Sequence, residues 1–133
     1  MLFRSGERKR LMDTFIVGTG GIFGALTRYY LGKYIAVRAD SDFPWGTFII
    51  NISGAFLLSF LTFYKPLIMS NYYLNIKLLI MTGFLGAYTT FSTLSYETYQ
   101  LVKNKDYKNL ALYFFGSLVL GLLSAYLGML TGK

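Results

Sequence analysis

Residues 83–97, reading GFLGAYTTFSTLSYE, constrain the fold of this chain more than any other segment. They lie within an apolar stretch from about residue 74 to residue 102, yet they contain two glycines and five serine or threonine hydroxyls. In a membrane, backbone groups that leave a helix must find partners within the protein, so such a segment is tolerated only where it is buried or lines a polar cavity. The sequence therefore predicts a broken membrane helix that forms an ion or solute site.

The composition is typical of a membrane protein. Hydrophobic residues make up 54% of the chain, charged residues only 14% and aromatic residues 19%. A bilayer core is crossed by about 20 apolar residues in a helix. We therefore expect an all-α integral membrane protein with four transmembrane helices, the third of them broken, in a single domain over residues 1–133. The predicted spans are about 14–36, 45–64, 74–102 and 109–130.

The connections between these spans are short, so neighbouring helices should pack antiparallel with no domain outside the membrane. The basic N-terminus precedes an apolar run without a small-residue cleavage site, which favours a retained first helix over a secretory signal. The chain has no cysteine and no histidine. Disulfides, thiolate metal sites and imidazole-based catalysis are thereby excluded, and we do not expect an enzyme.

The charge distribution bears on membrane orientation. The net charge of +7 is spread over the ends of the spans, which indicates membrane-flanking cations instead of a nucleic-acid surface. The 13 Lys and Arg residues divide seven to six between the two sides of the membrane. Two alternatives follow: the protein inserts in both orientations and two opposite copies pair about an axis in the membrane plane, or it inserts in one orientation with a weak bias.

Polar side chains follow the spans at helical spacing and have a common chemical bias. Asn51 and Arg28 offer N–H donors, and an amide or guanidinium at membrane depth is a functional-site hypothesis by default. Hydroxyl donors come from Thr47, Ser92, Thr93, Tyr113 and Ser117. The single acid within the spans is Glu97. Donors without facing carboxylates suit an anion, and the ring edge of Phe91 can also face one.

At these residues the chain resembles the Fluc fluoride channels, also called the CrcB family. The matching segments are GGIFGALTRY at 20–29, WGTFIINISGAFLL at 45–58, GFLGAYTTFST at 83–93, and the pair Tyr113 and Ser117. Each motif is modest by itself, but their order on four short spans is specific.

The resemblance implies an antiparallel, dual-topology homodimer with two fluoride pathways in the bacterial inner (cell) membrane. It also implies a structural Na⁺ at the dimer centre, held by the main-chain carbonyls of Gly86 and Thr89, and no other cofactor. The partners would be fluoride, membrane lipid and a second copy of the chain, with no nucleic acid.

The same resemblance assigns roles along the pathway. It makes Phe91 an ion-facing aromatic, Asn51 and Thr47 donors on the second helix, and Arg28 an organiser of the vestibule. Ser92 and Thr93 would be hydroxyls beside Phe91, and Tyr113 and Ser117 a polar track on the fourth helix. Glu97 matches a family acid and could pair with a basic group at the membrane edge.

Two positions depart from the family pattern. Leu94 stands where a second phenylalanine is usual, and Val119 where a further hydroxyl is common. The change at Leu94 leaves three alternatives. The chain could pair with a non-identical partner chain, the pore could lack one of its usual aromatic side chains, or the substitution could be tolerated in a homodimer. We favour the last.

The expected function is passive export of fluoride, which relieves fluoride toxicity, through a narrow donor-lined track that rejects chloride. The alternative is a proton-coupled exporter of the small multidrug type, for which Glu97 would be the sole candidate carboxylate. A subunit of a heterodimeric fluoride channel and a membrane assembly factor are further alternatives.

Overall fold

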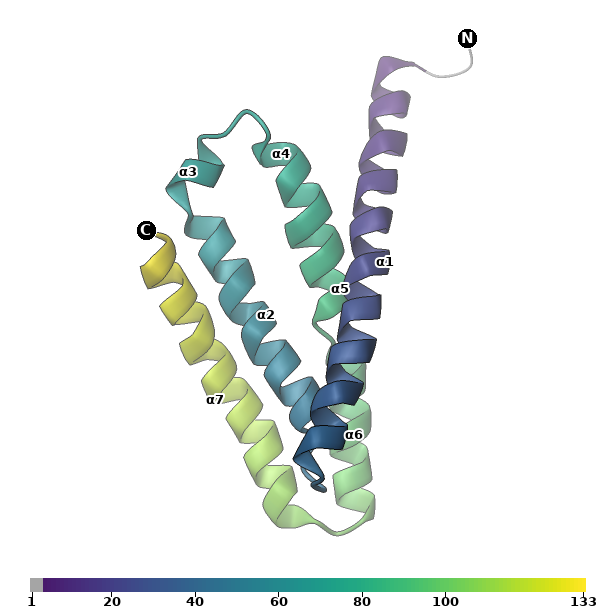
Figure 1. Ribbon diagram of the computed structural model, residues 1–133, viewed down its shortest axis with the longest axis vertical. Coiled ribbons are helices and arrows are strands. Elements are labelled where there is room, and N and C mark those ends of the chain that lie inside the picture. Colours follow the sequence, from purple (N-terminus) through teal and green to yellow (C-terminus); the bar gives the residue numbers. More distant parts are fainter. Residues whose placement is uncertain (1–3) are drawn as a thin grey trace.

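The computed structural model describes residues 4–133, which form helices joined by short connections. Within this part of the chain there is no β-strand, so the all-helical expectation is confirmed. Three long helices dominate the architecture: α1 (Ser5–Ala39), α2 (Trp45–Phe63) and α7 (Tyr107–Gly132). Between α2 and α7 the chain runs through several shorter helical pieces, and those from residue 73 to residue 103 follow one another as one further elongated segment (Figure 1).

The shorter pieces are α3 (Lys65–Ile68), α4 (Tyr73–Ile76), η1 (Lys77–Leu85), α5 (Gly86–Tyr88) and α6 (Phe91–Lys103). The piece η1 is a π-helix, an unusual form in proteins that is often found at functional sites. Between α5 and α6 the backbone leaves helical geometry. Thr89 has φ −75° and ψ 152°, and Thr90 has φ −147° and ψ 127°, so both residues are extended.

Three helical stretches among residues 4–133 are long and apolar enough to cross a membrane: Trp45–Phe63, Tyr73–Lys103 and Tyr107–Gly132. The first helix, α1, is the longest, with 35 residues and a length of about 50 Å, but its glycines, tyrosines and basic residues lower its hydropathy. It begins nine residues before the span expected from the sequence, at Ser5 instead of residue 14.

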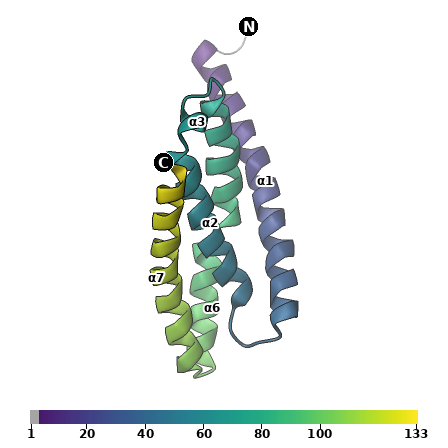
Figure 2. The same ribbon diagram turned by 60° about the vertical axis from the view of Figure 1, so that its left-hand side comes forward.

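The helices pack in pairs. α2 lies along α7, whereas α1 lies along η1 and α5, and α6 contacts the beginning of α7 (Figures 1 and 2). Glycines make the approach of α1 to η1 possible: a Cβ atom at Gly20 would collide with the carbonyl of Leu79, and one at Gly24 with that of Phe84. Small residues at helix contacts are the usual means of close packing in membranes.

The buried core of the described chain is small. One cluster joins Phe48, Leu101 and Tyr113, and a second joins Ile50, Leu85 and Tyr88. Large apolar side chains are instead exposed along every long helix. Such a surface is stable only when lipid or another protein covers it, which agrees with the membrane assignment.

Candidate functional site

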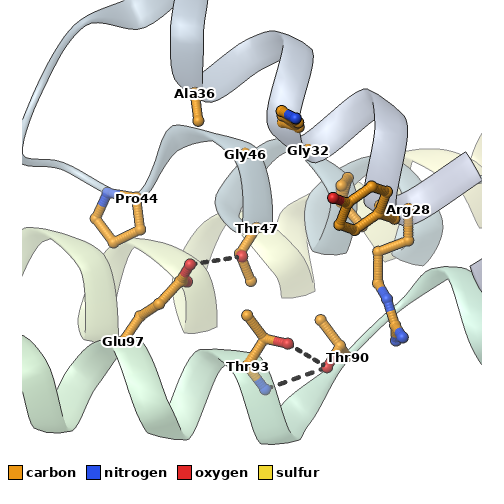
Figure 3. A pocket seen from close by; sticks show the side chains of 12 residues that line it. Arg28, Gly32, Ala36, Pro44, Gly46, Thr47, Thr90, Thr93 and Glu97 are labelled. Carbon is orange, nitrogen blue, oxygen red and sulfur yellow. Dashed lines mark hydrogen bonds between the residues drawn. The ribbon is translucent and has the colours of Figure 1, made fainter.

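A cavity of about 470 Å³ lies beside the extended residues, between α1, α2 and α6. Arg28, Gly32 and Lys33 of α1 form one wall, and Thr47 and Ile50 of α2 form another. The third wall comes from Thr90, Thr93 and Glu97. Figure 3 shows Arg28 and Glu97 on opposite sides of the view, with the three threonines between them. The cavity therefore joins the first-helix arginine to the hydroxyl-rich segment.

Asn51 bridges α2 to the extended backbone. Its Nδ2 donates to the carbonyl oxygen of Thr90 at 2.9 Å, and its Oδ1 accepts from the N–H of Thr90 at 2.8 Å. One side-chain amide thus satisfies both backbone groups of a residue that has left the helix. Because unpaired backbone groups are costly away from water, this amide stabilises the local extended conformation.

Thr90 is also the N-cap of α6. Its Oγ1 accepts from the N–H of Thr93 at 3.2 Å, and it donates to the hydroxyl of Thr93 at 3.1 Å. The hydroxyl of Ser92 also lies within hydrogen-bond distance of Thr90 Oγ1, at 3.3 Å. A threonine N-cap is a standard way to satisfy the first N–H groups of a helix, so α6 begins at a residue suited to start it.

These bonds release two main-chain carbonyls. In a continuous α-helix the carbonyl of Gly86 would accept from the N–H of Thr90, and that of Thr89 from the N–H of Thr93. Here Asn51 and the Thr90 side chain bind those two N–H groups instead. The carbonyls of Gly86 and Thr89 are therefore left without their helical donors. These are the two carbonyls that the family resemblance assigns to sodium.

Gly86 differs from the packing glycines of the chain. A Cβ atom at Gly86 would meet no atom within 4 Å, and the residue is exposed. Close helix contact within the chain therefore does not account for glycine at this position. Among residues 4–133 no group of three or more His, Cys, Asp or Glu side chains could hold a metal ion. Main-chain carbonyls are the donors suited to a hard cation in this region.

Glu97 lies at the centre of a second set of hydrogen bonds. Thr47 donates to one carboxylate oxygen at 3.1 Å, and Tyr113 donates to the other at 2.6 Å. The ring of Tyr113 is fully buried and packs edge-on against Phe43, at 5.7 Å between centroids. The hydrogen-bond partners of Glu97 in the described chain are thus two hydroxyls. The basic group expected from the sequence is not among them.

One face of α2 carries Thr47, Asn51 and Gly54, which follow one another at helical spacing. Thr47 contacts Glu97, Asn51 contacts Thr90, and Gly54 lies against the side chains of Thr89 and Tyr88. All three positions therefore face the interrupted third segment. The hydroxyl proton of Thr47 is donated to Glu97, so Thr47 acts here through the carboxylate.

Phe91 and Ser92 lie on the outer face of α6. Phe91 is 80% exposed, and neither residue lines the cavity. Leu94, where the family usually has a second aromatic, is partly buried against the cluster of Phe48, Leu101 and Tyr113. Within the single chain, Phe91 and Ser92 therefore lie apart from Thr47 and Thr93, which line the cavity.

The fourth-helix track is only partly connected. Ser117, one turn beyond Tyr113, has a buried hydroxyl that has no hydrogen-bond partner within the described residues. Ser124 donates to the carbonyl oxygen of Ile52 at 2.8 Å and so joins α7 to α2. Val119, at the other unusual position, is exposed. Ser117 thus has a donor available for a further partner.

Sequence reasoning missed two features of this site. It did not identify Thr90 as the residue that Asn51 holds, although a threonine directly before a helical run is a recognised N-cap signal. It also did not link Glu97 to Tyr113 and Thr47. No local signal could have found that link, since these residues lie 16 and 50 positions from Glu97 along the chain.

Comparison with known proteins gives one concordant result. The family model described as "CrcB-like protein, Camphor Resistance (CrcB)" matches residues 15–129. A protein of Clostridium acetobutylicum named fluoride-specific ion channel FluC 2 is 46% identical over 117 residues, which cover 88% of this chain and 95% of the relative.

Two further relatives show the same similarity. The fluoride-specific ion channel FluC of Acidobacterium capsulatum is 42% identical over 121 residues, covering 88% of this chain and 93% of its own. That of Thermosipho melanesiensis is 41% identical over 123 residues, covering 92% and 97% respectively. In each case the similarity spans nearly the whole of both chains.

Proposed function

The chain belongs to the CrcB family, and from that premise we propose that it is a passive fluoride channel, a transporter and not an enzyme, that exports fluoride and so relieves its toxicity. The observation that carries the proposal is the cavity beside Thr89 and Thr90. It combines basic side chains with hydroxyl donors and backbone freed from a helix. That combination suits a small anion that must exchange its water for protein donors.

The charges around the cavity favour entrance of an anion. Arg28 and Lys33 both line it, against one carboxylate, Glu97. That carboxylate accepts from two hydroxyls, which disperse its charge. The cavity is therefore positive on balance, and a positive, partly enclosed cavity raises the local concentration of anions. Arg28 fits the role of vestibule organiser better than that of direct ligand, because it stands at the wall opposite Glu97 (Figure 3).

The pathway beyond the cavity requires a second copy. Phe91 lies on the outer face of α6 at 80% exposure, and an aromatic that faces an ion must be enclosed by protein. An antiparallel copy covering this face would place the ring between two chains, beside the hydroxyls of Ser92 and Thr93. The buried, unpartnered hydroxyl of Ser117 is a further donor that such a track could use. The nearly even division of Lys and Arg, seven to six, supports insertion in both orientations.

The proposed channel crosses the bacterial inner membrane four times. α1 supplies the remaining crossing, since it packs along η1 and α5 over the middle of its length. The interruption at Thr89 and Thr90 then falls within the third crossing, where hydrogen bonds from Asn51 replace the missing helical ones.

A structural Na⁺ fits the freed carbonyls of Gly86 and Thr89. Two carbonyls from each of two copies would offer four oxygen ligands, of the hard type that alkali and alkaline-earth cations prefer. The ion would hold the two copies together at their centre. Its contribution would be to assembly, since the transported ion is an anion.

Each of two alternative hypotheses rests on one specific residue. A proton-coupled exporter would use Glu97, but this carboxylate is engaged by Thr47 and Tyr113, so the geometry favours a fixed structural acid. A heterodimer would explain Leu94, yet Leu94 packs against the chain's own core, which supports a tolerated substitution in a homodimer.

The proposal is tested by ion efflux from vesicles. The purified chain alone is reconstituted into liposomes loaded with fluoride or chloride, and release is followed with ion-selective electrodes. We expect rapid fluoride release without a proton gradient and almost no chloride release. Equal release of both halides, or no release until a second gene product is added, would contradict a selective homodimeric channel.

A further inference from the structure

A continuous groove runs between α1 and residues 72–84. Three hollows follow one another along it. The outer and middle hollows share Ile16 and Asn75, and the middle and inner hollows share Thr19 and Leu79. Because neighbouring hollows share residues from both walls, they form one groove that follows α1 from its first turns toward its middle.

The chemistry of the groove changes along its length. Arg8 and Lys9 line the outer hollow, with Asp13 as the one acid there. The inner hollow is lined almost entirely by carbon, from side chains such as Phe23 and Phe84. The groove is thus cationic at one end and apolar at the other, which is the pattern of a site for an amphiphile with an anionic head.

The dimensions agree with one leaflet of a bilayer. From Arg8 to Phe23 the helix advances 15 residues, or about 22 Å, which is half of the 40–45 Å that a bilayer spans with its headgroups. Tyr72, which lines the middle hollow and is 70% exposed, is the kind of aromatic found at the headgroup level.

We propose that this groove binds one anionic phospholipid, with its phosphate on Arg8 and Lys9 and one acyl chain along Thr19 and Leu79. A second copy of the chain is the less suitable occupant, because a protein surface would have to match a cationic and an apolar end within one groove. Asp13 reduces the positive charge at the mouth and so weakens binding of the headgroup.

The test is a lipid titration of the purified protein followed by native mass spectrometry. Phosphatidylglycerol and phosphatidylcholine with identical acyl chains are compared. The wild-type protein should bind phosphatidylglycerol more tightly, by about fivefold for each engaged cation. The double variant R8Q/K9Q should lose this preference. The matched control K105Q/K108Q removes one cation from the α6–α7 connection and one from the first turn of α7, and it should retain the preference.

Two single substitutions test binding of the lipid headgroup and of the acyl chain separately. Thr19→Phe fills the groove and should weaken binding of both lipids alike, whereas Thr62→Phe, at an equally exposed threonine that also bonds its own helix, should not. Asp13→Asn should increase the preference for phosphatidylglycerol. These variants lie outside the fluoride pathway, so fluoride release should persist in all of them.

Three results would overturn the proposal. R8Q/K9Q could leave the lipid preference unchanged, which would indicate unspecific lipid around the protein. Inorganic phosphate at equal concentration could displace the lipid, which would indicate a site for free phosphate. Thr19→Cys could form a disulfide between two copies in liposomes, which would show that a second chain covers the groove.

Discussion

The side-chain amide of Asn51 binds both backbone polar atoms of Thr90, at 2.9 Å and 2.8 Å. A single residue of α2 thereby replaces the hydrogen bonds that the third helical segment loses where it becomes extended. The same contact releases the carbonyl of Gly86 from its helical donor. The interruption is therefore held by a specific partner in a neighbouring helix, and a change at that partner should alter the interruption itself.

Replacement of Asn51 by alanine removes only a small side chain, but it should disrupt the site strongly. Two backbone groups of Thr90 would lose their partners, at a cost of about 2 to 4 kcal/mol in stability. Fluoride efflux from liposomes should fall below detection, and the midpoint of thermal unfolding in detergent should decrease. Asn71→Ala, at an exposed amide in the α3–α4 connection, is the control and should change neither measurement. Normal efflux in Asn51→Ala would contradict this role.

Replacement of Tyr113 by phenylalanine isolates its hydroxyl. The buried ring and its contact with Phe43 remain, but the 2.6 Å bond to Glu97 is lost. We expect a correctly folded dimer whose rate of fluoride release falls roughly tenfold, which corresponds to a rise of about 1.4 kcal/mol in the barrier to transport when Glu97 is no longer held in place. Tyr126→Phe removes an exposed hydroxyl from the same helix and should be silent. A fall in both variants would indicate a general effect on α7.

Phe91→Ile tests the outward-facing aromatic. The substitution keeps an apolar side chain of moderate size but removes the ring edge that can face an anion. Fluoride efflux should be lost while the elution volume of the dimer stays constant. Phe115→Ile, at a similarly exposed ring on α7, serves as the comparison and should conduct normally. If Phe91→Ile conducts and Glu97→Gln does not, the exporter hypothesis is favoured over the channel.

Two glycines should respond differently to alanine. Gly24→Ala should destabilise the chain, because its Cβ would collide with the carbonyl of Phe84. Gly86→Ala meets open space within the chain, so it should leave the fold intact and weaken only the pairing of two copies around sodium.

The measurement is dimer stability by size-exclusion chromatography, in sodium and in a large organic cation. Wild type should dissociate more readily without sodium, and Gly86→Ala should be dimer-deficient in both. Indifference of the wild-type dimer to sodium would contradict the proposed ion site.

The sequence predicted the helical content and the family because both depend on local signals. Apolar runs bounded by short polar connections mark the helices, and the motifs around Asn51 and residues 83–93 are contiguous. The positions of the helix ends were harder to predict from the sequence. α1 extends well before its apolar run, since Ser5 and the charged turn that follows are compatible with a helix but carry no membrane signal.

Within the site, spacing predicted which residues share a face but not how their donors are used. Thr47 and Asn51 share one face of α2, as their spacing predicted, yet both donate their hydrogen bonds to protein partners. The π-helical turn η1 also has no sequence signal, because a shift in hydrogen-bond register depends on tertiary packing against α1. The role of Leu94 depends on a core cluster that no local pattern reveals.

The two extended residues after Tyr88 also reset the angular phase of the third segment. In an unbroken rod each added residue turns the side-chain direction by a constant increment, so a face that suits α1 would dictate the face presented to α7. With the register interrupted at Thr89 and Thr90, the two halves choose their orientations independently. The half before Thr89 can therefore pack against α1 while α6 turns Thr93 toward the cavity. A continuous helix of the same length could not satisfy both orientations at once.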